Sequence, residues 1–426
     1  MNTGDLYALF LEHPSVQTDT RKLRSGDIFF ALKGTNFNGN TFARQAIESG
    51  ASYAVIDEAS FAIPGKTILV DDVLAALQDL ARFHRRQFSI PFLAITGSNG
   101  KTTTKELIHA VLSASLKTYT TEGNLNNQIG IPLTILKIRK DAEIAVIEMG
   151  ANHQGEIASY CTYVEPTHGL ITNCGKAHLE GFGGVEGVRK GKGELYDYLR
   201  THQGTAFVMK DYDYLLEMSR GIPRIITYGS GEADVTGNSI QHEPFLDVAV
   251  TKAAWTGTIH TRLVGEYNTP NVLAAVTTGI FFNVPGPQIK NAIEQYQPSN
   301  SRSQLIRHGS NQVILDAYNA NPSSMRLAIE NFAKRQDPAK VLILGGMAEL
   351  GADSLAEHKA IIELIGQHRW KDVILVGGDF LNIPHPYHNF QNVTEARKWL
   401  REQQFENTSW LIKGSRSMQM EKVLEH

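Results

Sequence analysis

Hydrophobic residues along the chain fall into short runs that alternate with amphipathic stretches, and this pattern predicts an α/β protein. In the first part, the runs at 27–32, 53–57 and 67–70 are typical of strands, whereas residues 73–88 are apolar at helical spacing and end in basic residues. Strand and helix patterns then follow one another to about residue 299, as expected for a parallel sheet covered by helices.

The last part of the sequence repeats this alternation after a break. Residues 284–303 are polar and contain prolines, so we expect a linker there. Strand-like runs follow, and helices are expected near 323–335, 354–368 and 394–404. Because strands followed by glycine turns favour a doubly wound sheet, this part predicts a second, smaller Rossmann-like domain. We therefore expect three domains, at residues 1–87, 88–299 and 300–426.

The composition narrows the class of protein. Of the 426 residues, 42% are hydrophobic and 20% are charged, with 41 basic against 44 acidic side chains. This balance disfavours disorder and a nucleic-acid-binding surface, so no nucleic-acid partner is expected. The two cysteines, Cys161 and Cys174, are too few for a disulfide scaffold or a four-cysteine zinc site.

The same evidence bears on location. The sequence has no run near the ~20 apolar residues that span a bilayer. Its first residues, MNTGDLYALFLEH, lack the basic region and the cleavage site of a secretory signal. Together with the cysteine usage, this favours a cytoplasmic protein without membrane insertion.

A glycine-rich turn after an apolar strand is the first candidate for chemistry. The run FLAIT at 92–96 leads into TGSNGKTTT at 96–104, and a helix is expected from about Thr102. Backbone amides at a helix N-terminus suit a polyphosphate, with Lys101 at the β- and γ-phosphates and the Thr102 hydroxyl on Mg²⁺. The alternative is a glycine turn with a surface lysine. The candidate nucleotide contacts are Gly97, Ser98, Asn99, Gly100, Lys101, Thr102 and Thr103.

This loop departs from the commonest phosphate loop. The G-x-x-x-x-G-K-[ST] spacing fails because Ile95 stands five residues before Gly100. The loop is instead the shorter Gly97-x-x-Gly100-Lys101-Thr102, which argues against the GTPase and motor groups.

Six motifs in order resemble the ATP-dependent Mur ligase superfamily, which forms amide bonds on peptidoglycan precursors. They are TGSNGKTTT, EGNLNNQIGIPLTIL (122–136), IEMGAN (147–152), AHLEGFGG (177–184), DAYNANPSSM (316–325) and LIKGSRSMQME (411–421). The second and fifth resemble the branch that joins D-alanyl-D-alanine to a UDP-N-acetylmuramoyl-tripeptide. In addition, residues 19–34 and 37–42 resemble the UDP-sugar-recognising N-terminal domain of two branches of the superfamily.

The resemblance implies a fold and a set of partners. A central P-loop parallel-sheet ATPase domain would be flanked by an N-terminal UDP-sugar-binding α/β domain and a C-terminal Rossmann-like domain. The substrates would be UDP-N-acetylmuramoyl-tripeptide and D-alanyl-D-alanine, the cofactors ATP and Mg²⁺, and the protein a monomer. In this superfamily ATP activates a carboxylate as an acyl phosphate, which the amine then displaces.

The resemblance also implies a metal site. Glu148 ends the apolar run 142–148, and His178 follows a strand-like run and a glycine turn. Matched to the family, both would be ligands of a second Mg²⁺, with Thr102 on the first. Lys192 falls where most of these ligases carry a carbamylated lysine, with Lys190 as the less favoured choice. The alternative for Glu148 is a solvated carboxylate at a strand end. For His178 it is a core histidine, and for Lys192 it is a solvated lysine. The candidate catalytic residues are Lys101, His178, Lys192 and Asp316.

A further segment, GEYNTPNVLAA at 265–275, resembles the family's nucleotide-binding helix start. Asn271 would contact adenine, with Asn268 as the second contact. The alternative is helix capping by Asn268 or Thr269 with Pro270 at the first helical position, and both roles can coexist. Tyr267 replaces the usual histidine. Arg302 matches an arginine that reaches the γ-phosphate, and Asp316 matches a ribose- or catalysis-linked aspartate. Since these two belong to the third domain, that domain would have to close over the second.

The remaining candidates concern the other substrates. For the uridine and diphosphate they are Thr20, Arg21, Lys33, Gly34 and Asn38, with Asn40 the least secure. For the tripeptide or the sugar they are Asn124, Asn126 and Asn127, which are also ordinary turn formers. For the dipeptide carboxylate they are Lys413, Gly414, Ser415 and Arg416, where a surface helix start is the alternative. Gly346 stands where aspartate is common and receives no role.

Other functions remain open at this point. The MurE-type and folylpolyglutamate ligases share the phosphate loop and the chemistry, but the two branch-specific runs weigh against both. A catalytically silent scaffold would have no need of Lys101, Glu148 and Lys192 together. A plain P-loop ATPase or a kinase would leave Arg302 and Asp316 without a role.

Overall fold

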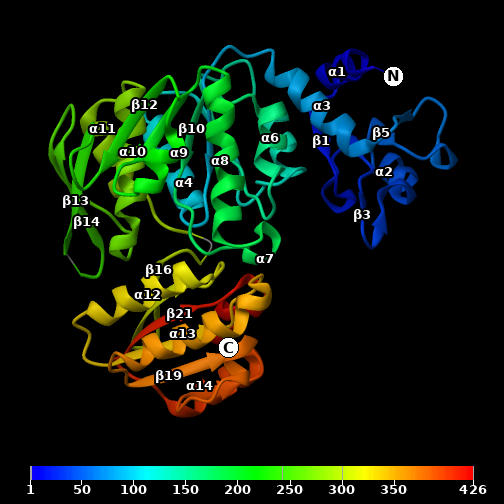
Figure 1. Cartoon of the computed structure of the whole chain (residues 1–426). Coiled ribbons are helices and arrows are strands. Elements are labelled where there is room, and N and C mark those ends of the chain that lie inside the picture. Colours follow the sequence, from blue (N-terminus) through cyan, green and yellow to red (C-terminus); the bar gives the residue numbers. More distant parts are fainter. Residues whose placement is uncertain (1, 242, 300, 426) are drawn as a thin grey trace.

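Each of the three predicted parts of the chain contains a larger β-sheet (Figure 1). The computed structural model describes residues 2–241, 243–299 and 301–425. The sheets lie within residues 16–69, 92–260 and 304–413. We propose domain boundaries at 87/88 and 299/300. None of the three larger sheets crosses either boundary. Among the described helices, none is long and apolar enough to cross a membrane.

The first sheet is parallel, and its central strands are buried because they consist of apolar residues on both faces. In sheet order its strands are β1 (Val16–Gln17), β2 (Ile28–Phe30), β5 (Tyr53–Ile56) and β6 (Thr67–Leu69). A small hairpin stands beside it, formed by β3 (Lys33–Gly34) and β4 (Phe37–Asn38). The helices of this part are α1 (Thr3–Glu12), η1 (Thr20–Lys22), η2 (Gly39–Phe42), α2 (Ala43–Glu48), η3 (Ala59–Phe61) and α3 (Val73–Arg85).

Helix α3 joins the first part to the second. Its N-cap residue is Asp72, whose side chain accepts a hydrogen bond from the Ala75 amide. Its other end is anchored by Arg85, which is buried, donates to the carbonyls of Val164 and Glu165, and lies over the ring of Phe92. The helix packs on α1 as well as on two helices of the central part, so the N-terminal lobe is held against the central domain.

The central sheet has nine strands in the order β15-β14-β13-β12-β11-β10-β7-β9-β8. Their bounds are β7 (Phe92–Thr96), β8 (Thr118–Thr120), β9 (Ile144–Glu148), β10 (His168–Ile171), β11 (Thr205–Met209), β12 (Arg224–Gly229), β13 (Val235–Gln241), β14 (Leu246–Lys252) and β15 (Gly257–His260). The pairings from β8 to β13 are parallel, whereas β13, β14 and β15 pair antiparallel. The expected parallel sheet therefore has an antiparallel edge, where short connections join β13, β14 and β15 as consecutive hairpins.

Helices cover this sheet, as the alternating pattern predicted. They are α4 (Lys101–Ser113), α5 (Gly130–Leu136), α6 (Glu156–Val164), α7 (Leu179–Phe182), α8 (Val185–Thr201), α9 (Asp213–Ser219), η4 (Glu266–Asn268), α10 (Thr269–Phe281) and α11 (Gly286–Gln295). The helix α4 that follows the phosphate loop packs on α10, and α8 packs on β10. The central domain therefore contains the segments 97–104, 185–192 and 265–271, which these contacts hold in place.

The C-terminal sheet has the order β16-β17-β21-β18-β19-β20, and all its pairings are parallel except β16 with β17. Its strands are β16 (Gln304–His308), β17 (Asn311–Asp316), β18 (Lys340–Gly345), β19 (Asp372–Val376), β20 (His388–Phe390) and β21 (Ser409–Lys413). The main helices are α12 (Pro322–Lys334), α13 (Ser354–Gly366) and α14 (Val393–Gln403), at the expected places. Strands β16 and β20 are edge strands that the sequence pattern did not predict.

The carboxyl ends of parallel strands determine where a site can form. Strands β9, β7 and β10 are neighbours, so Glu148, the loop after Thr96 and the segment after Ile171 meet at one edge of the central sheet. In the third domain, Asp316 and Lys413 are register partners at the ends of β17 and β21. The third domain lies below this edge of the central domain in Figure 1, so the two sets of strand ends face each other.

Candidate active site

The phosphate loop has the conformation that its glycines allow. Gly97 and Gly100 both have positive φ, at +141° and +80°, and Gly100 is the N-cap of α4. A Cβ on Gly97 would overlap the Thr172 hydroxyl, and one on Gly100 would lie 2.7 Å from Oδ1 of Asn271. The loop is tied to the segment after β10, since the Ser98 and Asn99 amides donate to the backbone and side-chain oxygens of Asn173.

Lys101 is folded back onto this loop. Its Nζ donates to the carbonyls of Gly97, at 2.7 Å, and Ser98, at 3.3 Å. Burial lowers the pKa of the Lys101 ammonium, and the carboxylate of Glu148 only partly offsets this effect. A cation held in this way by weak partners can exchange them for phosphate oxygens.

Glu148 is 1% exposed at the end of β9, close to the loop. Its Oε1 accepts hydrogen bonds from the Thr102 hydroxyl, at 3.1 Å, and from Nδ2 of Asn126, at 2.6 Å. Its Oε2 has no hydrogen-bond partner among the described residues, and the nearest cation, Nζ of Lys105, is 3.9 Å away. A buried carboxylate oxygen without a partner is costly, so this atom is a candidate ligand for a cation.

His178 is held in an unusual backbone conformation between the two domains. It has φ of +52° and precedes α7 as its N-cap residue. Its Nδ1 lies 2.6 Å from Oε2 of Glu349 in the third domain, close but not aligned as a hydrogen bond. The neighbouring imidazole lowers the pKa of the Glu349 carboxyl. The histidine is therefore not the core residue of the alternative interpretation.

Lys192 is 1% exposed on α8, whereas Lys190 on the same helix is exposed. Nζ of Lys192 donates to the carbonyl of Ala151 at 2.8 Å and lies 4.8 Å from the centre of the Phe182 ring. Burial holds the pKa of Lys192 well below its usual range, and the nearby Lys101 lowers it further. Lys192 is therefore not a solvated surface lysine, whereas Lys190 is.

These residues can be tested against the needs of a magnesium ion. Thr102, Glu148 and His178 all line one cavity, and the unpartnered Oε2 of Glu148 is a hard oxygen ligand of the kind Mg²⁺ takes. In the described part of the chain, no group of three His, Cys, Asp or Glu side chains is placed to hold a metal by itself. Additional oxygens would have to come from phosphates, water or a modified lysine, which suits Mg²⁺ at a nucleotide site.

Two asparagines at the start of α10 form a short hydrogen-bonded series. Asn271 accepts from the Thr104 hydroxyl at 3.0 Å and donates to Oδ1 of Asn268 at 2.8 Å, while Asn268 donates to the Val264 carbonyl. Neither side chain caps its helix. Both residues are buried and line the cavity, so the capping alternative is not what the structure has.

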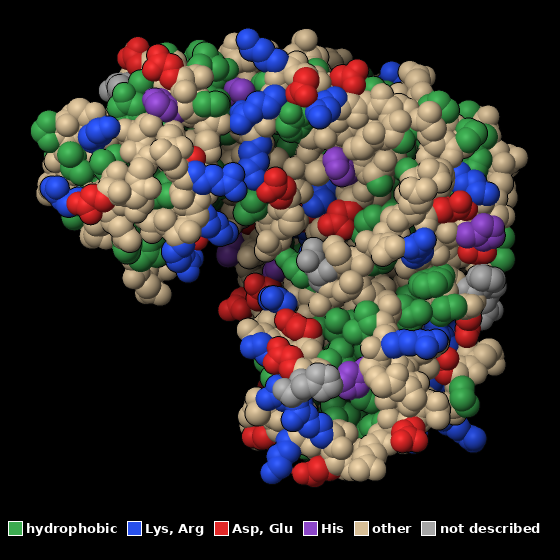
Figure 2. Space-filling view, turned by 180° about the vertical axis from the view of Figure 1, so that it is seen from behind, with side chains coloured by type: hydrophobic (Ala, Val, Ile, Leu, Met, Phe, Trp, Pro, Cys, Tyr) green, Lys and Arg blue, Asp and Glu red, His purple; other side chains and the backbone are tan. Residues whose placement is uncertain are grey.

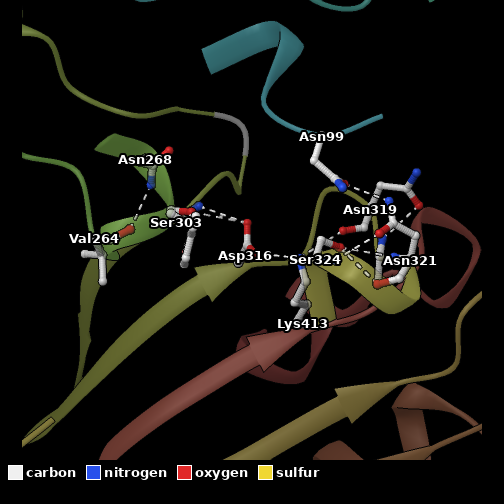
Figure 3. Close-up of polar contacts among 11 residues, drawn as sticks. Asn99, Val264, Asn268, Ser303, Asp316, Asn319, Asn321, Ser324 and Lys413 are labelled. Atoms are coloured by element: carbon white, nitrogen blue, oxygen red, sulfur yellow. Dashed lines mark hydrogen bonds and ion pairs between the residues drawn. The ribbon is translucent and has the colours of Figure 1, made fainter. Parts of the chain in front are cut away.

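The third domain contributes the opposite wall (Figure 3). The guanidinium of Arg302 lies 3.5 Å from the centre of the Tyr318 ring, and its Nε has no hydrogen-bond partner among the described residues. Asp316 accepts from the Ser303 amide through Oδ1, at 3.1 Å, and from Nζ of Lys413 through Oδ2, at 2.6 Å.

Both walls enclose one cavity of about 940 Å³. Its lining includes Lys101 and Glu148 from the central domain and Arg302 and Asp316 from the third domain. The contact that joins the two domains most directly at the loop runs from Nδ2 of Asn321 to Oδ1 of Asn99. The third domain is therefore in direct contact with the second at the rim of this cavity.

The N-terminal candidates lie outside this cavity. Arg21 is exposed and pairs with Asp19 through two hydrogen bonds, and Lys33 lies 3.1 Å from a carboxylate oxygen of Asp57. Figure 2 shows the surface hollowed between the N-terminal lobe, at upper left, and the C-terminal lobe, with lysine and arginine side chains along its edge. Thr20, Gly34 and Asn38 belong to the same lobe, and no contact of theirs reaches the central site.

Asn40 differs from its neighbours because it is fully buried. Its Nδ2 donates to Oδ1 of Asp57, at 2.8 Å, and its Oδ1 accepts from the Asp57 amide, at 3.0 Å. Its side chain thus links η2 to the segment that follows β5. This contact explains why the polar residue is tolerated in the interior.

The other substrate candidates divide in the same way. Asn126 and Asn127 line the cavity, and Asn127 also accepts from the amides that begin α5, while Asn124 is exposed outside it. Of the segment 413–416, only Lys413 lines the cavity. Ser415 bonds to Gly346 and Arg416 to Glu421, and a short 3₁₀-helix begins at Arg416. At Gly414, which precedes Ser415, an added Cβ would lie 3.0 Å from Cα of Gly345.

Several residues of the site were missed by the sequence analysis. Asn173, Ser303, Asn321 and Glu349 all line the cavity or tie its walls together. Asn173 could have been found, since it is a polar residue after a buried strand beside the phosphate loop. The others come from a domain whose placement no local pattern predicts.

Known proteins resemble this chain over its full length. Three family models match it: "Mur ligase family, catalytic domain" over residues 14–85, "Mur ligase middle domain" over 95–279 and "Mur ligase, glutamate ligase domain" over 301–416. A protein of Escherichia coli (strain K12) named UDP-N-acetylmuramoyl-tripeptide–D-alanyl-D-alanine ligase is 35% identical, covering 99% of this chain and 95% of its own.

Two further comparisons agree. A Bacillus subtilis (strain 168) protein of the same name is 33% identical, with 96% of this chain and 92% of its own covered. A crystal structure of MurF from Acinetobacter baumannii has a TM-score of 0.88 at 32% identity, covering 96% of this chain and 92% of that chain. The expected fold and the resemblance read from the motifs are thereby confirmed. The chain belongs to the Mur ligase family and, within it, to the MurF type.

Proposed function

We propose that the protein is an ATP-dependent ligase that joins D-alanyl-D-alanine to UDP-N-acetylmuramoyl-tripeptide, a step of peptidoglycan precursor synthesis. One observation carries the proposal: the phosphate loop of the central domain and Arg302 and Asp316 of the third domain face one cavity. The names of the curated relatives support the identity of the two substrates. The alternatives with a single diamino acid or with glutamate find no support among them.

The reaction has two chemical steps. The terminal carboxylate of the tripeptide attacks the γ-phosphorus of ATP, the bond to the β-phosphate oxygen breaks, and an acyl phosphate and ADP form. The amine of D-alanyl-D-alanine then attacks the acyl carbon, loses a proton and expels phosphate, which leaves the amide. Both steps bring anionic or electron-rich groups together, so the protein must neutralise charge and exclude water.

We assign the nucleotide contacts accordingly. The amides of residues 97–103 would cradle the phosphates, and Lys101 would exchange its two carbonyl partners for the β- and γ-phosphate oxygens. Arg302, stacked on Tyr318 and with Nε unpartnered, would meet the γ-phosphate from the other wall. Asn268 and Asn271 would contact adenine, and Asp316 the ribose or the reacting groups.

We also propose a magnesium site. Thr102 would hold a first Mg²⁺, Glu148 and His178 would hold a second, and a carbamylated Lys192 would orient the metal site. The unpartnered Oε2 of Glu148 supports this assignment. When bound, Mg²⁺ supplies positive charge that offsets the phosphoryl oxygens. Meanwhile Asn126 and Thr102 orient the Glu148 carboxylate through their hydrogen bonds to Oε1.

The case for carbamylation of Lys192 rests on burial. The reaction adds CO₂ to a neutral amine and releases a proton, and the lowered pKa of Lys192 makes the neutral amine available. The carbonyl of Ala151, at 2.8 Å from Nζ, can accept the remaining N–H of the carbamate. Lys190 is exposed and lacks this environment.

The remaining assignments are also proposals. Thr20, Arg21, Lys33, Gly34 and Asn38 would receive the uridine and diphosphate in the N-terminal lobe, next to the hollow of Figure 2. Asn124, Asn126 and Asn127 would face the tripeptide or the sugar. We propose a monomer that works in the cytoplasm.

A phosphate-release assay tests this function. We expect phosphate and ADP only when ATP, UDP-N-acetylmuramoyl-tripeptide and D-alanyl-D-alanine are all present. Parallel reactions replace the dipeptide by a diamino acid or by glutamate, which separates the other ligase types. UDP-linked tripeptides with different third residues then identify the accepted peptide.

The controls decide between the alternatives. Release of phosphate without either acceptor would indicate a plain ATPase, and no release under any combination would indicate a silent scaffold. Stimulation by a single diamino acid or glutamate, rather than by the dipeptide, would overturn the proposal in favour of another ligase type.

A further inference from the structure

Four side chains form a continuous polar series that crosses from the central domain into the third. The Tyr267 hydroxyl lies 3.0 Å from Oγ of Ser303. The Ser303 amide and hydroxyl both approach Oδ1 of Asp316, at 3.1 and 3.5 Å. Nζ of Lys413 lies 2.6 Å from Oδ2 of the same carboxylate. Both oxygens of Asp316 are therefore held, one from each side (Figure 3).

The series is largely buried, with Tyr267 and Asp316 only partly covered where they line the cavity. Ser303 is 8% exposed and Lys413 is 2% exposed. The Tyr267 ring lies against Gly265, where φ is +97° and any Cβ would overlap the ring. Burial, followed by the charge of Asp316, raises the pKa of the Tyr267 phenol, so it stays protonated and can donate. In such surroundings a lost hydrogen bond is not simply replaced by water.

The first two members of the series, Tyr267 and Ser303, lie beside candidate nucleotide contacts in the sequence. Tyr267 belongs to η4, directly before Asn268. Ser303 directly follows Arg302 in the segment that enters the third domain. A single hydroxyl contact therefore connects the turn proposed for adenine with the arginine and the aspartate proposed for the phosphates and ribose.

We propose that Tyr267 and Ser303 are positioning residues that orient Asp316 at the nucleotide and hold the third domain closed on the central one. Lys413 has the matching role on the other carboxylate oxygen, where it also bonds to the Asn319 carbonyl at 3.2 Å. The part of the proposal that concerns the nucleotide rests on the proposed function, whereas the domain contact does not.

Tyr267→Phe is the sharpest variant because it keeps the ring against Gly265 and removes only the hydroxyl. We expect KM for ATP to rise about fivefold, the effect of one neutral hydrogen bond, while kcat changes less. Ser303→Ala should behave alike, since Ala has the same Cβ and differs only by the hydroxyl. In the double variant the effects should not add, because both substitutions break the same contact.

The matched control is Tyr163→Phe. Tyr163 is 2% exposed in α6, and its hydroxyl has no hydrogen-bond partner among the described residues. We expect its KM for ATP to equal that of the wild type. A fivefold rise in this control as well, or additive effects in the Tyr267 and Ser303 double variant, would overturn the proposal.

Domain closure is measured separately, without any catalysis. Spin labels on Glu217→Cys in α9 and Lys359→Cys in α13 report the distance between the two domains, and both positions are exposed. The native Cys161 and Cys174 are buried, so they should stay unlabelled. We expect a single narrow distance distribution in the labelled wild-type background, and a broader, longer one after Tyr267→Phe.

The kinetic measurement and the spin-label distances together distinguish a failure of the proposed ligase function from a failure of the positioning role of Tyr267. If the wild type shows no ligase activity but the distance distribution responds to Tyr267→Phe, the proposed function fails and the domain contact stands. If the wild type is an active ligase and Tyr267→Phe changes neither KM nor the distances, the positioning role is wrong and the function stands.

Discussion

Nδ2 of Asn321, the N-cap residue of α12, donates to Oδ1 of Asn99 in the phosphate loop at 2.7 Å (Figure 3). The Oδ1 atom of Asn321 meanwhile accepts from the Ser324 amide at 2.9 Å and caps the helix. One amide group thus serves both the stability of the third domain and its contact with the loop that is proposed to hold ATP. The two roles can be separated by substitution.

Asn321→Asp should separate them. Aspartate caps a helix as well as asparagine, so we expect an unchanged unfolding midpoint in urea. The new carboxylate cannot donate to Asn99 and adds negative charge beside the phosphates, so the affinity for ATP should fall at least about fivefold. Asn321→Ala should lower both the stability and the affinity. Equal ATP affinity of Asn321→Asp and wild type, by isothermal titration, would refute the role of this contact.

Lys101→Ala should abolish most activity. The ammonium is the only charged side chain of the phosphate loop itself, and its two carbonyl partners are replaceable by phosphate oxygens. Loss of one such preorganised donor lowers kcat by about 10²–10³-fold. The measurement is phosphate release together with ATP binding, and circular dichroism checks the fold. Lys105→Ala is an unsuitable control, because Lys105 is itself buried next to Glu148; the exposed Lys140→Ala, expected to match wild type, serves instead.

Lys192→Ala should lower activity by at least about 10–100-fold, since it removes a proposed metal-orienting group. Added formate or acetate should restore part of the loss by supplying a carboxylate to the space left by the side chain. In the wild type, ¹³C-bicarbonate should give a carbamate signal by nuclear magnetic resonance that Lys192→Ala lacks and Lys190→Ala keeps. A carbamate signal that persists in Lys192→Ala would contradict the assignment.

Gly346→Asp, which introduces the residue common in the family, should destabilise this protein. A Cβ at Gly346 would lie 2.7 Å from Cα of Gly378, and the Gly346 carbonyl accepts from Ser415. Overpacking of this kind costs about 1–3 kcal/mol in the free energy of unfolding. Gly231→Asp is the matched control, because nothing lies within 4 Å of a Cβ there. Urea denaturation of both variants checks the difference.

The stability of the central domain should depend on pH through His168. Its ring packs against Phe207, Phe281 and Phe282, and burial lowers its pKa to about 4. Because the unfolded state binds the proton more tightly, this stabilising contribution is complete above about pH 6.5 and is lost as the pH falls through 4. The full loss is about 3 kcal/mol.

His168→Phe keeps an aromatic ring in place and removes the titration. We therefore expect its free energy of unfolding to vary less between pH 7 and pH 4.5 than that of the wild type. His202→Gln, a substitution of an exposed histidine, should leave the pH dependence as it is. An unchanged slope in His168→Phe would show that other groups are responsible.

Much of the fold was readable from local pattern. The phosphate loop could be placed because a buried strand, two glycines and a helix follow one another within a few residues. The helices of the third domain and several buried strands of the three sheets were predicted for the same reason, since period and apolar runs are local properties. The antiparallel edge of the central sheet was not, because pairing direction depends on which strands become neighbours.

The candidate site divides along the same line. By itself, the sequence determined which residues could bind phosphate or metal, since chemical type and order along the chain suffice for that. Only the tertiary structure decided that Lys192 rather than Lys190 is buried, that Asn40 bonds to Asp57, and that Tyr267 meets Ser303 across two domains. The physical reason is that burial, charge pairing and domain contact arise between residues far apart in the chain, and their energies depend on distance in space rather than on separation in sequence.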